Sequence, residues 1–183
     1  MAWLIAGIAL FFGVHVLTSL PILRGRVLSR LGGGGYKGLY SLASFAGLGL
    51  IVAGMARSPF VPLWNAPEWG RHAAVWLMPV AFILVFAAYI PGNIKRATAH
   101  PMLWGVTLWA LLHLLANGDL AGLLLFGGFG LYSLYAMWSQ NRRGARAANS
   151  RRAVTGDIAA IVAGLVAYAL LRNYHGTLFG VAV

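Results

Sequence analysis

Long apolar stretches, separated by short polar or glycine- and proline-rich segments, run through the whole chain. An apolar run of about 20 residues is long enough to cross the hydrocarbon layer of a bilayer as an α-helix. The pattern predicts six such helices, at about residues 2–23, 36–56, 72–90, 101–116, 120–138 and 154–171. We therefore expect an all-α fold, an integral membrane bundle of about six transmembrane helices, forming a single domain over residues 1–183.

The segments between the predicted helices carry residues that favour turns and loops. Three arginines and four consecutive glycines predict a loop over residues 24–35. Asn117-Gly118-Asp119 predicts a tight turn between the fourth and fifth helices, and Pro79 predicts a kink in the third. The first helix has no basic residues before it and no small-residue cleavage site, which indicates a retained helix rather than a signal peptide.

The composition agrees with a membrane protein and excludes several other classes. Hydrophobic residues make up 60% of the chain and charged residues only 9%, too few polar residues for the surface of a soluble domain of this length. The net charge of +11 could indicate nucleic-acid binding, but the basic residues lie in short loops, so we expect no nucleic-acid partner. The absence of cysteine excludes disulfides, iron–sulfur clusters and thiolate ligands.

The basic residues are distributed unevenly between the two sides of the predicted bundle. Positively charged loops remain on the cytoplasmic side of a membrane. Only Arg57, Arg71 and Arg172 lie on one side, whereas the loops after the first, third and fifth helices hold the other basic residues: Arg24, Arg26, Arg30, Lys37, Lys95, Arg96, Arg142, Arg143, Arg146, Arg151 and Arg152. Both termini should therefore face away from the cytoplasm, and we expect residues 142–152 to set topology and to contact anionic lipid headgroups.

Two histidines, His15 and His113, lie within predicted membrane-spanning helices. An ionisable side chain inside the hydrocarbon is costly, which makes each a candidate functional residue. Counted along the helices, His15 lies roughly 20 Å from the outer end of the first and His113 roughly 18 Å from the inner end of the fourth. Both are thus expected near the middle of the membrane, where two imidazoles could bind one haem iron from opposite faces. The alternative for each is a hydrogen bond to a neighbouring helix.

The residues one turn before these histidines are aromatic. Phe11 precedes His15 and Trp109 precedes His113, and both rings would suit packing against a flat macrocycle. Two further histidines, His72 and His100, are expected at the membrane surfaces, where they are secondary candidates or simply cap helices and meet water. His175 is expected in a solvated tail after the sixth helix.

The acidic residues argue against other metal centres and against a transporter. None of the three is expected at the middle of the membrane, since Glu68, Asp119 and Asp157 lie near the ends of predicted helices. A carboxylate-bridged di-iron or hydrolytic centre is therefore not expected. Inverted repeats and paired broken helices, typical of transporters, are not evident either.

Two segments carry a resemblance that covers most of the chain. Residues 99–134, AHPMLWGVTLWALLHLLANGDLAGLLLFGGFGLYSL, and residues 14–51, VHVLTSLPILRGRVLSRLGGGGYKGLYSLASFAGLGLI, resemble the NnrU family of bacterial membrane proteins. That family is associated with nitrite and nitric oxide metabolism in denitrifying bacteria. It is related to 15-cis-zeta-carotene isomerase, a haem b protein in which a redox change of the iron switches its ligation.

The resemblance implies roles for individual residues. The two haem-ligating histidines of the isomerase match His15 and His113, and its two other important histidines match His72 and His100. Asn117, in the turn after His113, is a further candidate. The isomerase has a cysteine where this chain has Ala110, so an exchange between thiolate and imidazole ligands is not available.

A more distant resemblance, to membrane methyltransferases, fails at two points. Those enzymes use an Arg-His-Pro segment, where this chain has Ala99 before His100, and acidic residues that are missing from residues 140–152. We therefore do not expect methyltransferase activity.

The sequence thus predicts a haem b protein of the bacterial inner membrane with His15 and His113 as axial iron ligands and Phe11 and Trp109 beside the ring. Three functions remain open. The protein is a haem-dependent cis–trans isomerase of a lipid-like substrate, an electron-relay or nitric oxide-sensing partner of a nitrogen-oxide reductase, or a structural assembly protein without a cofactor. Membrane lipid is the one partner implied by composition, and no catalytic residue or oligomeric state is predicted.

Overall fold

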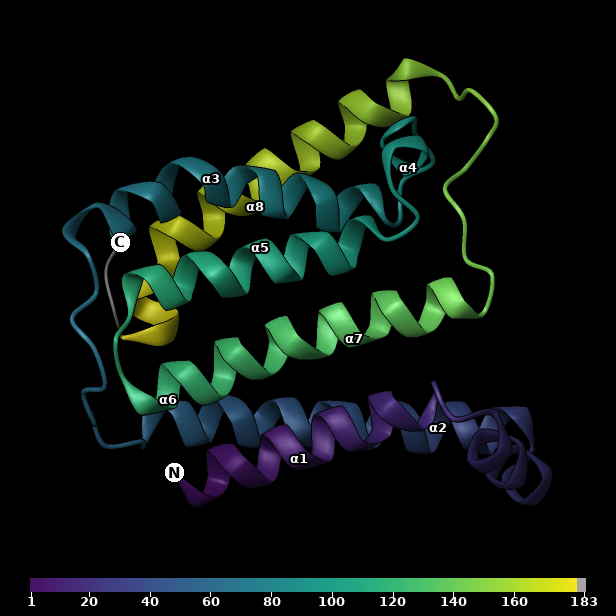
Figure 1. Cartoon of the computed structure of the whole chain (residues 1–183), viewed down its shortest axis with the longest axis horizontal. Helices are drawn as coiled ribbons and strands as arrows, with labels where there is room; N and C mark the ends of the chain where they lie inside the picture. Colours follow the sequence, from purple (N-terminus) through teal and green to yellow (C-terminus); the bar gives the residue numbers. More distant parts are fainter. Residues whose placement is uncertain (181–183) are drawn as a thin grey trace. The chain divides into compact units, whose positions relative to one another are not determined.

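The computed structural model describes residues 1–180, and its regular elements are helices. Their order is α1 (Ala2–Leu17), α2 (Pro21–Ala56), α3 (Glu68–Ala87), α4 (Ile94–Ala97), α5 (Pro101–Ala116), α6 (Leu120–Gly122), the π-helix η1 (Leu123–Gly127), α7 (Gly128–Arg142) and α8 (Val154–Phe179) (Figure 1). Four helices are long and apolar enough to cross a membrane: α2, α3, the continuous helix Leu120–Arg142 and α8. The shorter apolar helices α1 and α5 complete the six predicted elements. The prediction of an all-α, multi-pass membrane bundle is confirmed.

The contacts within the chain divide it into two compact units, Met1–Val61 and Pro62–Val183. The first unit holds α1 and α2, and the second holds the remaining helices. We describe each unit by itself, and the expectation of one domain over residues 1–183 stays a prediction.

In the first unit, α1 and α2 form a hairpin whose helices touch at glycines. Gly7 of α1 and Gly47 and Gly54 of α2 are buried. A Cβ atom added at Gly7 would lie 2.6 Å from the backbone nitrogen of Ile51, and one added at Gly47 would lie 2.9 Å from that of Phe11. Small residues at such positions let the two backbones approach closely, as is common where helices pack within membranes.

The segment at residues 24–35, predicted to be a loop, is helical instead. Helix α1 already ends at Leu17 rather than at residue 23, and α2 begins at Pro21, a residue favoured in the first turn of a helix. The one break is Gly32, whose φ of 67° and ψ of 172° lie outside the helical region. Gly32 therefore separates a short helix, residues 21–31, from the long apolar helix of residues 33–56.

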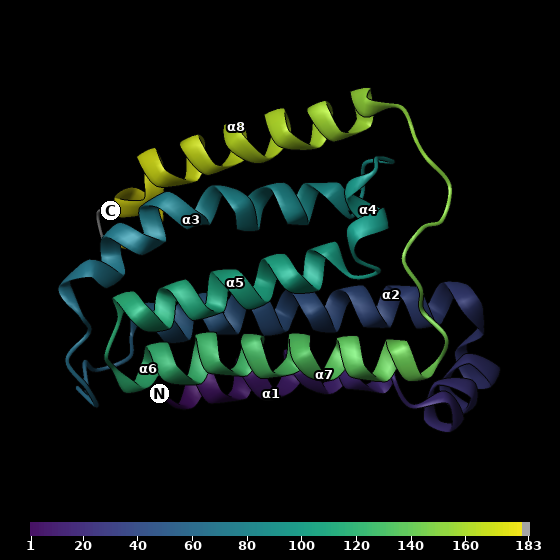
Figure 2. The same ribbon diagram turned by 45° about the horizontal axis from the view of Figure 1, so that its top comes forward.

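In the second unit, α3 packs between α5 and α8, and α5 also packs against α7 (Figure 2). The buried side chains of Met78, Ala81 and Leu112 form the core of the contact between α3 and α5. A hydrogen bond from the Tyr168 hydroxyl to the carbonyl oxygen of Val75, 2.7 Å long, joins α8 to α3. Helix α8 continues to Phe179, so His175 lies within a helix and is partly buried, which corrects its expected place in a solvated tail.

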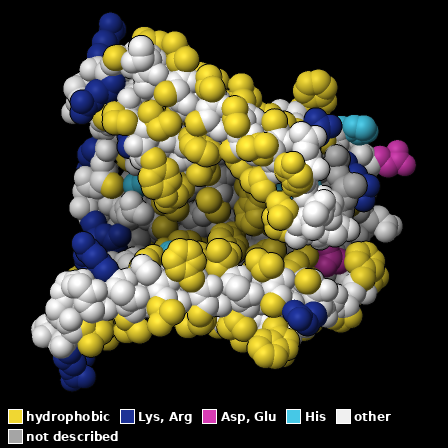
Figure 3. Space-filling view, turned by 180° about the vertical axis from the view of Figure 1, so that it is seen from behind, with side chains coloured by type: hydrophobic (Ala, Val, Ile, Leu, Met, Phe, Trp, Pro, Cys, Tyr) yellow, Lys and Arg dark blue, Asp and Glu magenta, His cyan; other side chains and the backbone are white. Residues whose placement is uncertain are grey.

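One end of this unit is basic and is held together by hydrogen bonds. The Asp157 carboxylate accepts bonds from the Ile94 backbone N–H (3.0 Å) and the Asn93 side-chain amide (2.8 Å). Asn93 also exchanges hydrogen bonds with the backbone of Arg152, and the Ala148 N–H donates to the Lys95 carbonyl (2.9 Å). These bonds tie the α3–α4 loop and α4 to the start of α8 and to the segment before it, where lysine and arginine side chains gather (Figure 3).

The opposite end of this unit contains the predicted tight turn. The Gly118 carbonyl accepts hydrogen bonds from the backbone N–H groups of Leu63 (2.7 Å) and Trp64 (3.1 Å). The buried Asp119 carboxylate accepts one from the Gly122 N–H (3.1 Å) and caps α6. The turn thus fixes where α5 ends and where the next membrane-crossing helix begins.

Candidate functional site

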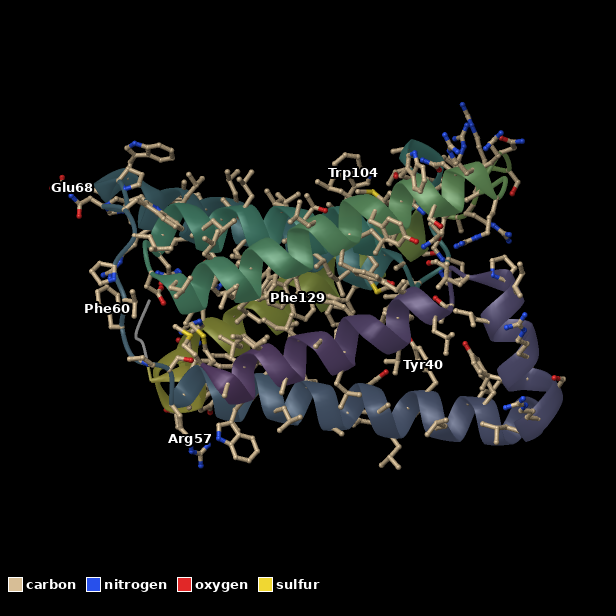
Figure 4. All side chains as sticks on the ribbon, turned by 60° about the horizontal axis from the view of Figure 1, so that its bottom comes forward. Tyr40, Arg57, Phe60, Glu68, Trp104 and Phe129 are labelled. Atoms are coloured by element: carbon tan, nitrogen blue, oxygen red, sulfur yellow. The ribbon has the colours of Figure 1, made fainter. Side chains whose placement is uncertain are left out.

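His15 lies in the last turn of α1, partly buried against α2. Its Nδ1–H donates a hydrogen bond of 2.6 Å to the carbonyl oxygen of Phe11, four residues earlier. Its ring stacks on that of Phe11 with centroids 4.1 Å apart and lies 5.2 Å from the ring of Tyr40, on α2 (Figure 4). The imidazole is therefore held in one orientation by its own helix and by aromatic neighbours.

His113 repeats this arrangement in the second unit. It lies in the last turn of α5, and its Nδ1–H donates to the carbonyl oxygen of Trp109 at 2.9 Å. Its ring stacks on Phe126 with centroids 4.4 Å apart and lies 5.0 Å from Trp109. Trp109 in turn makes an edge contact with Phe129 of α7, 5.6 Å away (Figure 4).

Both histidines donate from Nδ1 to the carbonyl oxygen four residues earlier, and this hydrogen bond selects the tautomer of each imidazole. A neutral imidazole that donates from Nδ1 carries its lone pair on Nε2, and this is the form that binds a metal through Nε2. Metal-ligating histidines commonly donate their other ring N–H to a carboxylate or a backbone carbonyl, which fixes the ring and raises its basicity. His15 and His113 both meet this condition.

Two neighbours of His113, Asn117 and Phe126, lie in the segment that follows α5. The Asn117 side chain, predicted as a further candidate, donates a 2.8 Å hydrogen bond to the backbone carbonyl of His113. This bond stabilises the end of α5 and does not involve the imidazole. Phe126, which stacks on the imidazole, lies within the π-helix η1. Such π-turns are often found at functional sites. Neither Phe126 nor Tyr40 was singled out from the sequence, because apolar and aromatic residues are abundant throughout this chain.

The depth expected for the two histidines needs correction. The sequence placed both near the middle of the membrane. Because α1 ends at Leu17 rather than at residue 23, His15 lies in the last turn of its helix, and His113 lies in the last turn of α5, which has the predicted bounds. His15 is thus next to the turn that leads into residues 21–31, and His113 is next to the Asn117-Gly118-Asp119 turn.

The other histidines have different surroundings. His100 precedes the first turn of α5, is 7% exposed, and shares a 2.8 Å hydrogen bond between its Nε2–H and the Asn141 side-chain oxygen near the end of α7. Its Nε2 is therefore occupied in joining two helices. His72 is exposed near the start of α3. His175 lies 4.9 Å from the ring of Phe179 in α8.

A haem and a metal bound by protein side chains alone need different numbers of protein ligands. Within residues 1–180, no group of three or more His, Asp or Glu side chains is placed to hold a metal ion. A haem needs only one or two axial ligands from the protein, since its porphyrin supplies the others. In the first unit the Tyr36 hydroxyl is buried without a hydrogen-bond partner among the described residues, and its ring stacks on that of Tyr40 at 6.3 Å. A buried hydroxyl of this kind is satisfied if a polar group binds beside it.

The comparison with protein families covers nearly the whole chain. No curated protein and no solved structure matches it. The model of the family described as NnrU protein matches residues 3–183 and so includes every histidine discussed above. The chain therefore belongs to the NnrU family.

Proposed function

We propose that this protein binds haem b in the bacterial inner membrane, and that Nε2 of His15 and Nε2 of His113 are each an axial ligand of a haem iron. One observation carries the proposal. Both histidines donate from Nδ1 to the carbonyl oxygen four residues earlier, and this tautomer carries its lone pair on Nε2, the form that binds a metal.

The surrounding side chains would prepare the two imidazoles for this task. The hydrogen bonds to Phe11 and Trp109 hold the rings in place, and the stacked rings of Phe11 and Phe126 limit their rotation. A bound haem would supply a redox-active iron whose potential depends on its axial ligands and on the hydrogen bonds behind them.

Membership of the NnrU family supports a role in nitrite and nitric oxide metabolism, as an electron-relay or assembly partner of a nitrogen-oxide reductase. Co-purification with such a reductase is the measurement that supports this role. The alternative, isomerisation of a lipid-like substrate, rests on the match of His15 and His113 to the ligands of the carotene isomerase. Expression in a carotenoid-accumulating host tests it, since an unchanged pigment profile contradicts isomerase activity.

The haem proposal is tested by optical spectroscopy of the purified full-length protein in oxidised and reduced states. We expect a Soret band and a pyridine haemochrome typical of haem b. His15→Ala and His113→Ala should each shift the Soret band or lose haem. His72→Ala is the matched control, because His72 is exposed, and it should retain the wild-type spectrum.

Two results would contradict the ligand assignment. If both alanine variants keep the wild-type spectrum, neither histidine binds the iron. If the wild type shows no Soret band when haem is supplied, neither histidine is a haem ligand.

A further inference from the structure

The short helix at residues 21–31 forms one wall of an open hollow in the first unit. The hollow has a volume of about 450 Å³ and is lined by two guanidinium groups and four aliphatic side chains: Leu17, Leu23, Arg26, Val27, Arg30 and Leu31. Along a helix, the five residues from 23 to 31 share one face, with the arginines on one side of it and the aliphatic residues on the other. A ligand that fits this lining has an anionic end and an apolar end.

The two arginines of the hollow have no carboxylate in their own unit to neutralise them. Residues 1–61 contain no aspartate or glutamate at all. Arg26 and Arg30 are four residues apart, so like charges face each other on adjacent turns, which destabilises a helix unless an anion lies between them. Their neighbour Arg24 is engaged elsewhere, with its guanidinium 6.0 Å from the centre of the Tyr36 ring.

The place of the hollow in the unit matches the level of lipid headgroups. The break at Gly32 turns residues 21–31 away from the axis of the long apolar helix (Figures 1 and 4). The short helix exposes apolar side chains beside its arginines, with Ile22 73% and Leu23 44% exposed. A basic helix with exposed apolar residues is typical of segments that lie in the membrane interface. The positive charge of this end assigns it to the cytoplasmic leaflet, which is rich in anionic lipid.

From these observations we propose that residues 17–31 bind one anionic phospholipid. Arg26 and Arg30 hold its phosphate through the forked hydrogen bonds that guanidinium groups make with phosphate oxygens. Leu17, Leu23, Val27 and Leu31 line its glycerol backbone and the upper part of its acyl chains. A topology signal needs only positive charge, whereas this hollow combines charge with guanidinium geometry and an apolar wall. The proposal does not depend on haem binding.

The test is native mass spectrometry of the full-length protein in detergent, titrated with phosphatidylglycerol, phosphatidylcholine or inorganic phosphate. We expect the wild type to retain one phosphatidylglycerol and to bind phosphatidylcholine more weakly, because the choline ammonium group cancels the charge of the phosphate and repels the two guanidinium groups. The double variant Arg26→Gln, Arg30→Gln should bind phosphatidylglycerol at least about tenfold more weakly, because a hydrogen bond to a charged group contributes on the order of a tenfold change in affinity. Arg71→Gln, Arg172→Gln is the matched control, since it removes the same charge from exposed positions on the other side of the predicted bundle and should leave the retained lipid in place.

Other outcomes would overturn the proposal. Equal affinities of the wild type and of the Arg26, Arg30 double variant would show that the lipid binds elsewhere. Displacement of phosphatidylglycerol by millimolar inorganic phosphate would show a site for free anion rather than for lipid. Wild-type affinity in Arg26→Lys, Arg30→Lys would show that charge alone is enough and that the forked geometry has no part. All variants change exposed side chains, so circular dichroism should confirm that they fold.

Discussion

At the scale of single residues, the ring nitrogen that each histidine uses separates the candidate ligands from the structural histidine. His15 and His113 bond to their own helices through Nδ1, whereas the buried His100 uses Nε2 to reach Asn141 on another helix. From the sequence all three were candidates, because a residue type and its position along a helix do not reveal which nitrogen is engaged. Only the packing of α5 against α7 shows that His100 holds two helices together.

Replacing His100 should therefore lower stability without changing a haem spectrum. In His100→Ala the hydrogen bond to Asn141 is lost together with the packing of the buried imidazole, which costs about 1–3 kcal/mol. Asn141→Ala should cost a similar amount, and the double variant should cost less than the sum of the two. The measurement is thermal unfolding in detergent together with the optical spectrum. Loss of the Soret band in folded His100→Ala would show that His100 belongs to the metal site.

At the scale of helices, the sequence predicted elements best where hydropathy and helix-end signals coincide. The range 101–116 was predicted as α5 has it, because proline begins it and Asn117-Gly118-Asp119 ends it. Residues 24–31 were wrongly assigned to a loop, since their low hydropathy excludes a spanning helix but not an interfacial one. The π-helix η1 has no recognisable signal in an apolar run of leucines and glycines. The stacking of Phe126 on His113 was therefore out of reach of sequence reasoning.

The glycines between α1 and α2 provide a direct test of the hairpin. Gly54→Ala would place a methyl group against the backbone of Leu4, so the helices would have to separate, at a cost of about 1–3 kcal/mol. Gly49→Ala is the matched control on the same helix, because no atom of the described residues lies within 4 Å of the added methyl group. It should leave stability unchanged or raise it by up to about 1 kcal/mol, since alanine favours helix. Equal unfolding temperatures of the two variants would contradict this packing.

The Asp157 carboxylate, near the start of α8, provides a test of the contact between α8 and the α3–α4 loop. Asp157→Ala removes the acceptor for the Ile94 N–H and the Asn93 amide, so the α3–α4 loop should open more often. Hydrogen exchange at residues 91–97 should become faster than in the wild type. Thr155→Ala, at an exposed position two residues earlier, should leave that exchange unchanged. Unaltered exchange in both variants would mean that other contacts hold the loop.

At the scale of the whole molecule, basic residues gather at one end of each unit. In the second unit, hydrogen bonds bring Asn93, Lys95, Ala148 and Arg152 together, so the basic residues of two loops that are distant in sequence share one end. In the first unit, the arginines of residues 21–31 lie at the end of α2 opposite Arg57 (Figure 4). The sequence predicted this segregation from loop charges alone, because it depends only on the number of helices between the loops.

The absence of cysteine from the chain makes the predicted orientation directly measurable. Positive charge keeps a loop in the cytoplasm, so residues 142–152 should face inward and the segment between α2 and α3 should face outward. Single cysteines at exposed positions in the two regions, Ser150→Cys and Asn65→Cys, report on this with a membrane-impermeant maleimide. Asn65→Cys should react in cells whose inner membrane is intact, and Ser150→Cys only after that membrane is opened. The reverse pattern would place the arginines of residues 21–31 in the outer leaflet, where the positive-inside rule no longer supports binding of an anionic phospholipid.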